Sequence, residues 1–390
     1  MKLIEKRAGS LRSPRMNFIG RALSAALSFV AAHTSGADFT KAGNLVIAGG
    51  AISSVESKLW EIMLAGRKDG RPIGIISTAS EDPVTTGKEF SARINEAFGA
   101  NSSVFLPLGV KSNPPDEKTI VEEILRCGGF YFTGGNQERT TRTLLHKDGT
   151  RTNALDAIWE VYLSGGIIGG TSAGAAVMSH PMITGGTSAG AIRFGVPKGV
   201  ALGSGLGFHP GVLYCQHHLE RARYGRLMAA LVSDAAGIKL GMGVCEDTAM
   251  VVNHQTHTAR VIGSNGVLVL DSTKMGAASN GGWSGMRAHY LTAGDTFDLT
   301  DGDVIPASEK SQVLEPSSTG KTEVEFPAWE KNALQKALRS MTGTPAVKRL
   351  VAKDGPYSIH FERSAKTQAF TTQDKTLATL TNLAATLEVE

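Results

Sequence analysis

The sequence has little cysteine, few aromatic residues and no long apolar run. Its three cysteines, Cys127, Cys215 and Cys245, make neither a disulfide framework nor a zinc-ligand pattern. No segment is apolar over the roughly 20 residues that a membrane-spanning helix requires. Aromatic side chains make up only 6% of the chain, while 390 residues are enough to bury a large core. A globular chain of about one to three domains is therefore expected.

The net charge is small and unevenly placed. Residues 1–37 carry six basic residues against Glu5, an excess larger than the formal charge of +4 for the whole chain. The basic residues are Lys2, Lys6, Arg7, Arg12, Arg15 and Arg21. Because the rest of the chain is nearly neutral, the sequence does not predict a nucleic-acid partner.

Residues 1–37 have the pattern of a signal peptide. Basic residues precede an apolar segment at 22–32, and the small residues at 35–37 resemble a cleavage site. Translation from Met16 would give a leader of ordinary length. We expect a secreted or periplasmic protein that has no membrane contact after cleavage. An N-terminal arm on a cytosolic enzyme is the alternative.

The stretch 166–178 predicts a strand, a sharp turn and a helix. An apolar run ends at Gly169 and Gly170, small residues flank Ser172, and helix formers follow. Residues 170–174 match G-x-S-x-G, the nucleophile elbow, in which a strained turn exposes a serine hydroxyl above a sheet. A helix N-terminus beside it favours developing negative charge. Ser172 is therefore the candidate nucleophile.

Residues 185–191 repeat residues 169–175 without a change. Pro181 precedes this second copy and argues against a central strand. Gly195 and Pro197 follow it and argue against a helix. We expect the second copy to be a Gly-rich loop and Ser188 not to be the nucleophile.

Strands and helices alternate over most of the chain. The predicted strands lie at 44–50, 72–78, 103–108, 129–137, 166–170, 211–217 and around 241–244, and the predicted helices between them at 54–66, 87–98, 118–127 and 153–163. This alternation predicts an α/β fold with three layers, αβα, around a mostly parallel central sheet. We expect a hydrolytic domain at 38–306. Residues 307–390 are then a linker and a C-terminal extension.

A serine hydroxyl needs a base to take its proton and an acid to orient that base. His217 and His218 end a predicted strand, and adjacent residues of a strand point to opposite faces, so at most one faces the serine. His254 and His257 are the rivals, in a polar stretch after another strand.

Two carboxylates, Glu246 and Asp247, also end a strand. The residues alone leave two chain orders open for the catalytic groups. One is serine, His217 and Glu246. The other is serine, Asp247 and His257, the order of the α/β-hydrolases, although it leaves only nine residues between acid and base.

Three arginines follow the candidate base: Arg221, Arg223 and Arg226. We expect a helix over 219–233, on which Arg223 and Arg226 share a face. A guanidinium matches a carboxylate with two parallel hydrogen bonds. The run therefore predicts a substrate that carries a carboxylate.

These segments together resemble the cyanophycinases, serine exopeptidases related to peptidase E on a class I glutamine amidotransferase-like fold. The resemblance is carried by FTGGNQ at 132–137, GTSAGA at 170–175, Gln216 and His217 with the three arginines, and EDTA at 246–249. It runs from about residue 44 to about residue 303. The arginine run is the specific part, because peptidase E-like dipeptidases share the elbow and lack that run.

The resemblance implies a role for each candidate residue. Ser172 is the nucleophile, His217 the base and Glu246 its orienting acid, which decides between the two orders. The implied oxyanion hole is formed by the backbone N–H groups of Ala173 and of Gly134 or Gly135. The implied substrate pocket is lined by Gln137, Gln216, Arg221, Arg223 and Arg226.

The resemblance also implies a substrate and a reaction. The substrate is cyanophycin, a poly-aspartate backbone with arginine on each β-carboxyl, and the product is the β-Asp-Arg dipeptide. An acyl-enzyme forms on Ser172, and no metal or other cofactor is needed. The alternatives are a related Asp-specific dipeptidase or isopeptidase, and a catalytically inactive homologue that only binds such chains. The sequence leaves the oligomeric state open, and a homodimer is one alternative.

The sequence departs from the family pattern at two cysteines. The residue before Gln216 is usually Asp and is Cys215 here, which leaves substrate selectivity open. The residue before Glu246 is often Asp and is Cys245 here. Because their strands must approach each other, a disulfide between them is a hypothesis for an oxidising compartment. Two small buried apolar residues are the alternative.

Overall fold

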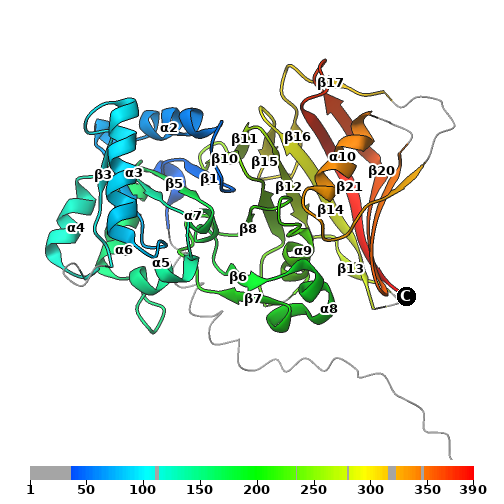
Figure 1. Ribbon diagram of the computed structural model, residues 1–390, viewed down its shortest axis with the longest axis horizontal. Coiled ribbons are helices and arrows are strands. Elements are labelled where there is room, and N and C mark those ends of the chain that lie inside the picture. The colour runs from blue at the N-terminus through cyan, green and yellow to red at the C-terminus, as the bar shows by residue number, and fades with distance from the viewer. Residues whose placement is uncertain (1–36, 110–113, 234, 279–280, 315–321, 344–346) are drawn as a thin grey trace, which may run out of the picture. The chain divides into compact units, whose positions relative to one another are not determined.

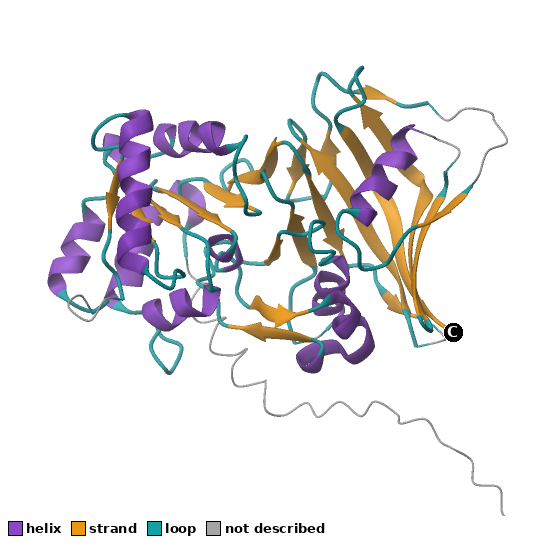
Figure 2. Cartoon of the chain, viewed as in Figure 1, coloured by secondary structure: helices purple, strands orange, loops and turns teal. Residues whose placement is uncertain are grey.

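The computed structural model describes residues 37–109, 114–233, 235–278, 281–314, 322–343 and 347–390. Of the predicted leader, residues 1–36 lie outside the described residues. Residues 38–390 form one compact unit (Figure 1). In this unit, helices gather around the N-terminal strands, and strands dominate the C-terminal part (Figure 2). The predicted α/β class is confirmed.

The first sheet has nine strands in the order β16-β15-β11-β10-β1-β5-β4-β2-β3. Its parallel half consists of β1 (Leu45–Ala48), β5 (Ile167–Thr171), β4 (Gly129–Phe132), β2 (Ile73–Ile76) and β3 (Ser103–Phe105). These five strands pair in parallel, as the alternation of strands with helices predicted. The antiparallel half consists of β10 (Thr248–Asn253), β11 (Thr258–Gly263), β15 (Thr296–Asp298) and β16 (Val304–Ile305).

Helices cover both faces of the parallel half. Neighbouring residues of a strand point to opposite sides, so strands that are apolar at every position have two faces to bury. Tyr131 of β4 packs against Trp60 of α2, with ring centroids 5.1 Å apart. The next residue, Phe132, packs on Phe208, which contacts Trp159 of α6 at 4.8 Å. The helical segments here are η1 (Phe39–Lys41), α2 (Glu56–Ala65), η2 (Lys68–Gly70), α3 (Pro83–Phe98), α4 (Lys118–Leu125), α5 (Gln137–Leu144) and α6 (Asn153–Leu163). No helix in the described ranges is long and apolar enough to cross a bilayer.

The second sheet has ten strands, eight of them in the order β18-β19-β20-β21-β14-β12-β9-β8. Their bounds are β8 (Val212–Gln216), β9 (Leu240–Val244), β12 (Gly266–Asp271), β14 (Trp283–Thr292), β18 (Glu323–Glu325), β19 (Arg349–Asp354), β20 (Tyr357–Thr371) and β21 (Ala378–Val389). Short β13 (Gly276–Ala277) pairs with β14, and β17 (Ser311–Gln312) pairs with β20. The strands predicted at 211–217 and around 241–244 therefore lie in this second sheet.

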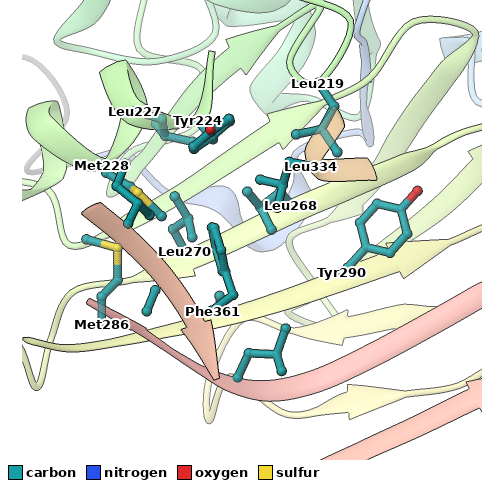
Figure 3. Close-up of a cluster of buried hydrophobic side chains, with 14 of the residues drawn as sticks. Leu219, Tyr224, Leu227, Met228, Leu268, Leu270, Met286, Tyr290, Leu334 and Phe361 are labelled. Atoms are coloured by element: carbon teal, nitrogen blue, oxygen red, sulfur yellow. The ribbon is translucent and has the colours of Figure 1, made fainter. Parts of the chain in front are cut away.

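An apolar cluster packs the second sheet against α9 (Tyr224–Val232) and α10 (Ala333–Gly343) (Figure 3). Leu268 of β12 and Phe361 of β20 belong to this cluster, together with Leu227 of α9 and Leu334 of α10. The two helices thus bury one face of the sheet, including strands from both ends of its order.

The C-terminal residues supply part of this core. β21 pairs with β20 on one side and with β14 on the other. Leu383, Ala385 and Leu387 of β21 alternate along the strand and all belong to the apolar cluster, as a strand with one buried face requires. Residues 307–390, expected to be a linker and an extension, thus contain strands of the same compact unit.

The three cysteines are buried free thiols. The hypothesis of a disulfide between Cys215 and Cys245 is therefore wrong. Cys215 of β8 lies opposite Gly243 of β9, and Cys245 comes two residues later, directly after the last residue of that strand. This offset separates the two Cα atoms by about 8 Å, more than a disulfide spans.

Candidate active site

Ser172 lies in a strained turn at the end of β5. Its backbone has φ 54° and ψ −110°, and α7 (Ala173–Ala176) begins at the next residue. Its N–H donates to the carbonyl of Ala48 in β1 at 3.0 Å. A Cβ on Gly174 would lie 2.2 Å from the carbonyl oxygen of Phe132, so helix and sheet approach this closely only with glycine there. The turn therefore has the conformation of a nucleophile elbow.

The second copy of the heptapeptide is not a loop, so that prediction was wrong. It forms the end of β6 (Met182–Gly186) and the start of α8 (Ser188–Lys198), beside β7 (Val200–Gly203) in a two-stranded ribbon. Pro181 precedes this ribbon strand without interrupting a central one, and Pro197 lies beyond a break in helical geometry at Gly195 and Val196. The buried hydroxyl of Ser188 donates to the carbonyl of Ala222 at 2.5 Å.

His217 joins the serine to a carboxylate. Its Nε2 lies 2.8 Å from the Oγ of Ser172, and its Nδ1 lies 2.8 Å from Oε1 of Glu246. Because Glu246 can only accept, Nδ1 carries the proton, and Nε2 is left to accept the serine hydroxyl. A Cβ on Gly50 would lie 2.2 Å from Cε1 of the imidazole, so the turn after β1 packs directly on the ring.

Burial lowers the pKa of His217, and the positive charges of Arg221 and Arg223 lower it further. The hydrogen bond with Glu246 acts in the opposite direction and raises this pKa. The net effect is a decrease, so the imidazole is neutral at pH 7 and able to accept a proton.

Glu246 follows β9, and its backbone is held on both sides. Its N–H donates to Oε2 of Glu220 at 3.0 Å. Its carbonyl accepts from Thr248 Oγ1 at 3.1 Å and from Asn265 Nδ2 at 2.9 Å. Sequence reasoning missed Glu220 and Asn265. One feature could have pointed to Glu220, since it is an acidic residue directly before the arginine run. Asn265 belongs to no motif, so nothing in the sequence pointed to it.

The alternative order through Asp247 is not assembled. The carboxylate of Asp247 accepts from the N–H groups of Ser53 and Val55, at 2.9 and 3.0 Å, and from the hydroxyls of Ser54 and Ser264. Burial raises the pKa of this carboxyl, but these hydrogen bonds outweigh it and lower the pKa to about 2. The carboxylate thus holds the chain before α2 and makes no bond to His257, an exposed turn residue between β10 and β11.

The other two candidate histidines make no hydrogen bond to Ser172 within the described part of the chain. His254 Nε2 bonds the hydroxyl of Tyr162 at 2.6 Å. His218 is fully buried, and a Cβ on Gly243 would lie 2.2 Å from its ring. The ring of His217 lies instead at Gly50, so the two neighbouring histidines contact different strand ends.

The turn between β4 and α5 approaches the serine. A Cβ on Gly134 would lie 3.4 Å from the Cβ of Ser172. Gly135 has φ +139°, and a Cβ there would meet the carbonyl of Ala79 at 2.2 Å, so only glycine fits. Gln137 begins α5 and donates through Nε2 to the carbonyls of Ile183 and Thr184, at 3.1 and 3.2 Å.

The arginine run lies in a turn and at the start of α9, which begins at Tyr224 and not at residue 219 as predicted. Arg221 is exposed. Arg223 is half-buried and donates from Nη1 to the carbonyl of Gln216 at 2.8 Å. Burial, followed by the charge of Arg226, lowers the pKa of Arg223 to about 10, so it remains positively charged at neutral pH.

Arg226 is only 5% exposed, and its donors are directed into the protein. Nε donates to Sγ of Cys215 and Nη1 to the carbonyl of Gly186, both at 3.3 Å. Gln216 is also buried, and its Oε1 has no hydrogen-bond partner among the residues described. The guanidinium of Arg226 therefore links the C-terminal end of β8 to the C-terminal end of β6.

Comparison with known proteins decides the family. The model of peptidase family S51 matches residues 45–260. The chain belongs to peptidase family S51. It is accordingly a hydrolase, a serine-type peptidase.

Several relatives of this S51 peptidase are curated as cyanophycinases. The one from Nostoc sp. is 32% identical over 280 residues, which cover 69% of this chain and 89% of that protein. The one from Geminocystis herdmanii is 31% identical over 269 residues, covering 65% and 93%. A crystal structure of a peptidase from an acI-B1 actinobacterium shares the fold, with a TM-score of 0.50 and 23% identity over 67% of this chain and 98% of that one.

Proposed function

We propose that this S51 peptidase hydrolyses cyanophycin to β-Asp-Arg dipeptides through an acyl-enzyme on Ser172. The observation that carries the proposal is the continuous chain from Ser172 through His217 to Glu246, with two contacts of 2.8 Å. The arginine run beside it supports a substrate that carries a carboxylate. The curated relatives named cyanophycinase support the choice of polymer.

The proposed reaction has two halves. As Oγ of Ser172 attacks an Asp carbonyl, Nε2 of His217 takes the hydroxyl proton, and Glu246 stabilises the imidazolium. The N–H groups of Ala173 and Gly134 donate to the oxyanion. His217 then protonates the leaving amine, which leaves an ester on the serine. Water, deprotonated by the same imidazole, hydrolyses the ester and restores the hydroxyl.

The proposed specificity comes from the arginines nearest the serine. Arg223 is half-buried, and Arg221 is exposed beside it in the same turn. We assign the substrate carboxylate to these two guanidinium groups. Arg226 is not assigned to the substrate, because Cys215 and Gly186 accept its donors.

Clearing of insoluble cyanophycin, with detection of the released dipeptide, tests the proposal. Arg223→Ala is expected to raise KM by about tenfold or more, because a charge-assisted hydrogen bond to substrate is lost. Arg260→Ala, which removes an exposed arginine of β11, is the matched control. Cleavage of Asp-containing dipeptides without clearing of the polymer would favour the related dipeptidase.

The pH dependence of kcat/KM reports the proposed base. The reaction needs neutral His217, so activity falls as the pH drops through its lowered pKa, below the usual value near 6.5. Arg221→Ala removes a positive charge that disfavours the imidazolium, so it raises this pKa. The acidic limb of the profile is expected to move to higher pH, and Arg260→Ala to leave it in place. A limb unchanged in Arg221→Ala would argue against His217 as the base.

We also propose that residues 1–37 direct export of the enzyme. Their basic and apolar pattern supports this. Mature protein recovered outside the cytoplasm, with an N-terminus near Asp38, is the expected result of fractionation and N-terminal sequencing. Full-length protein retained in the cytoplasm would contradict it.

A further inference from the structure

A C-terminal segment, residues 326–335, lies against the turn that carries His217. These residues are beyond residue 260, where the S51 family match ends. The N–H of Asn332 donates to the carbonyl of Leu219 at 2.9 Å. The hydroxyl of Tyr224 donates to the carbonyl of Ala328, and its ring packs on Trp329 with centroids 5.3 Å apart. The segment therefore contacts residues before and within the arginine run, Leu219 and Tyr224.

Gln335, in the first turn of α10, connects the C-terminal segment to the backbone of Glu246 through one intermediate residue, Asn265. Its side chain is 6% exposed, and Nε2 donates to Oδ1 of Asn265 at 3.1 Å and to the hydroxyl of Tyr290 at 3.2 Å. Asn265 in turn donates from Nδ2 to the carbonyl of Glu246 at 2.9 Å. The donation from Gln335 fixes the orientation of the Asn265 amide, because the opposite orientation would place its oxygen against the carbonyl of Glu246.

The rest of α10 shows that packing alone does not require an amide at this position. Leu334, Leu338 and Met341 of the helix belong to the apolar cluster that also contains Leu219 (Figure 3). A buried amide among such side chains is unfavourable unless it is hydrogen-bonded. An apolar residue would bury the same face, so the amide is explained by what it bonds.

We propose that Gln335 is a positioning residue for the catalytic acid, acting through Asn265 on the backbone of Glu246. This inference rests on the proposed role of Glu246. The carboxylate must meet Nδ1 of His217 at hydrogen-bond distance, and a rotation of its peptide would move it away. Two peptide groups flank the Cα of Glu246. Glu220 accepts from the N–H of the first, and Asn265 and Thr248 donate to the carbonyl of the second. The C-terminal segment thus helps to orient groups that the family region supplies.

Gln335→Met tests the proposal, because it keeps the volume and removes the donor. We expect kcat to fall by about three- to tenfold with KM nearly unchanged, since one hydrogen bond to a positioning group is lost. The rate at which diisopropyl fluorophosphate labels Ser172 is expected to fall by the same factor. Asn265→Leu, at a half-buried turn, should give a similar loss, and the double variant no further loss.

Asn95→Leu is the matched control. Among the described residues, the partner of this half-buried amide of α3 is Ser103 of β3, so its loss is expected to lower Tm and to leave kcat unchanged. Gln335→Met with a lower Tm but wild-type kcat and labelling rate would overturn the proposal, and so would additive effects of Gln335→Met and Asn265→Leu. Wild-type protein that is labelled at Ser172 but does not attack cyanophycin would refute only the proposed substrate.

Discussion

Replacing Ser172 with alanine is expected to lower kcat by about four to six orders of magnitude, because no other described group can form the acyl-enzyme at this position. Residual turnover would come from the oxyanion donors and from substrate binding alone. Release of the β-Asp-Arg dipeptide measures the loss. Labelling by diisopropyl fluorophosphate should disappear in the same variant.

Ser188→Ala is the matched comparison, since the two serines lie in identical heptapeptides. The hydroxyl of Ser188 donates to Ala222 and accepts from the N–H of Arg226, so it holds α8 against the start of α9. Its loss should cost about 1 kcal/mol of stability and leave most of the activity. Activity that survived Ser172→Ala and disappeared in Ser188→Ala would refute the assignment of the nucleophile.

Replacing Lys310 with methionine is expected to lower the free energy of unfolding by about 3–5 kcal/mol, because it leaves a buried carboxylate without its counter-charge. Lys310 Nζ lies 2.7 Å from Oδ1 of Asp295, and both side chains are fully buried. The ammonium also donates to Thr292 and Thr379 at 2.8 and 3.0 Å. These bonds join the chain after β16 to β14 and β21, so their loss should loosen the second sheet.

Urea denaturation of wild type and Lys310→Met measures this change. Lys58→Met is the control, because the Lys58–Glu61 pair has side chains 62% and 58% exposed and should contribute less than about 1 kcal/mol. A change below about 1 kcal/mol in Lys310→Met would show that the buried pair does not stabilise the fold as its burial implies. The kcat of Lys310→Met at a temperature where it is folded should match wild type.

Much of the first sheet follows from local pattern. The apolar runs at β1, β2, β4 and β5 are typical of strands buried on both faces, and each is followed by a turn rich in glycine or polar residues. The carboxyl ends of parallel strands meet at one edge, so Gly134 and Ser172 could be placed together before any coordinates. The pattern also placed His217 and Glu246 at strand ends, although it left the order of the catalytic groups to a family resemblance.

Sheet membership could not be predicted in the same way. β8 and β9 look like strands of the first sheet, but they pair with each other and, through β12 and β14, with strands near the C-terminus. Those partners lie far along the chain, and no periodicity within residues 211–244 indicates which edge they join. The contact of Gln335 with Asn265 depends on the same long-range pairing, so sequence reasoning missed both residues.

The two identical heptapeptides separate what sequence decided from what the fold decided. The sequence by itself determined that the first copy turns from a strand into a helix, since an apolar run precedes it and helix formers follow. For the second copy only the fold decided this, because the prolines near it predicted a loop and the structure has β6 and α8 there. Tertiary packing decided where the helix begins. In the first copy, the carbonyls of Ala48 in β1 and Phe132 in β4 lie on either side of residues 172–174 at the end of β5, where Ser172 has a positive φ and bonds His217. In the second, Thr187 caps the helix by accepting from the N–H of Gly190, so Ser188 lies inside the first turn with its hydroxyl buried. The same seven residues therefore give one candidate nucleophile and one structural serine, because different neighbours surround them.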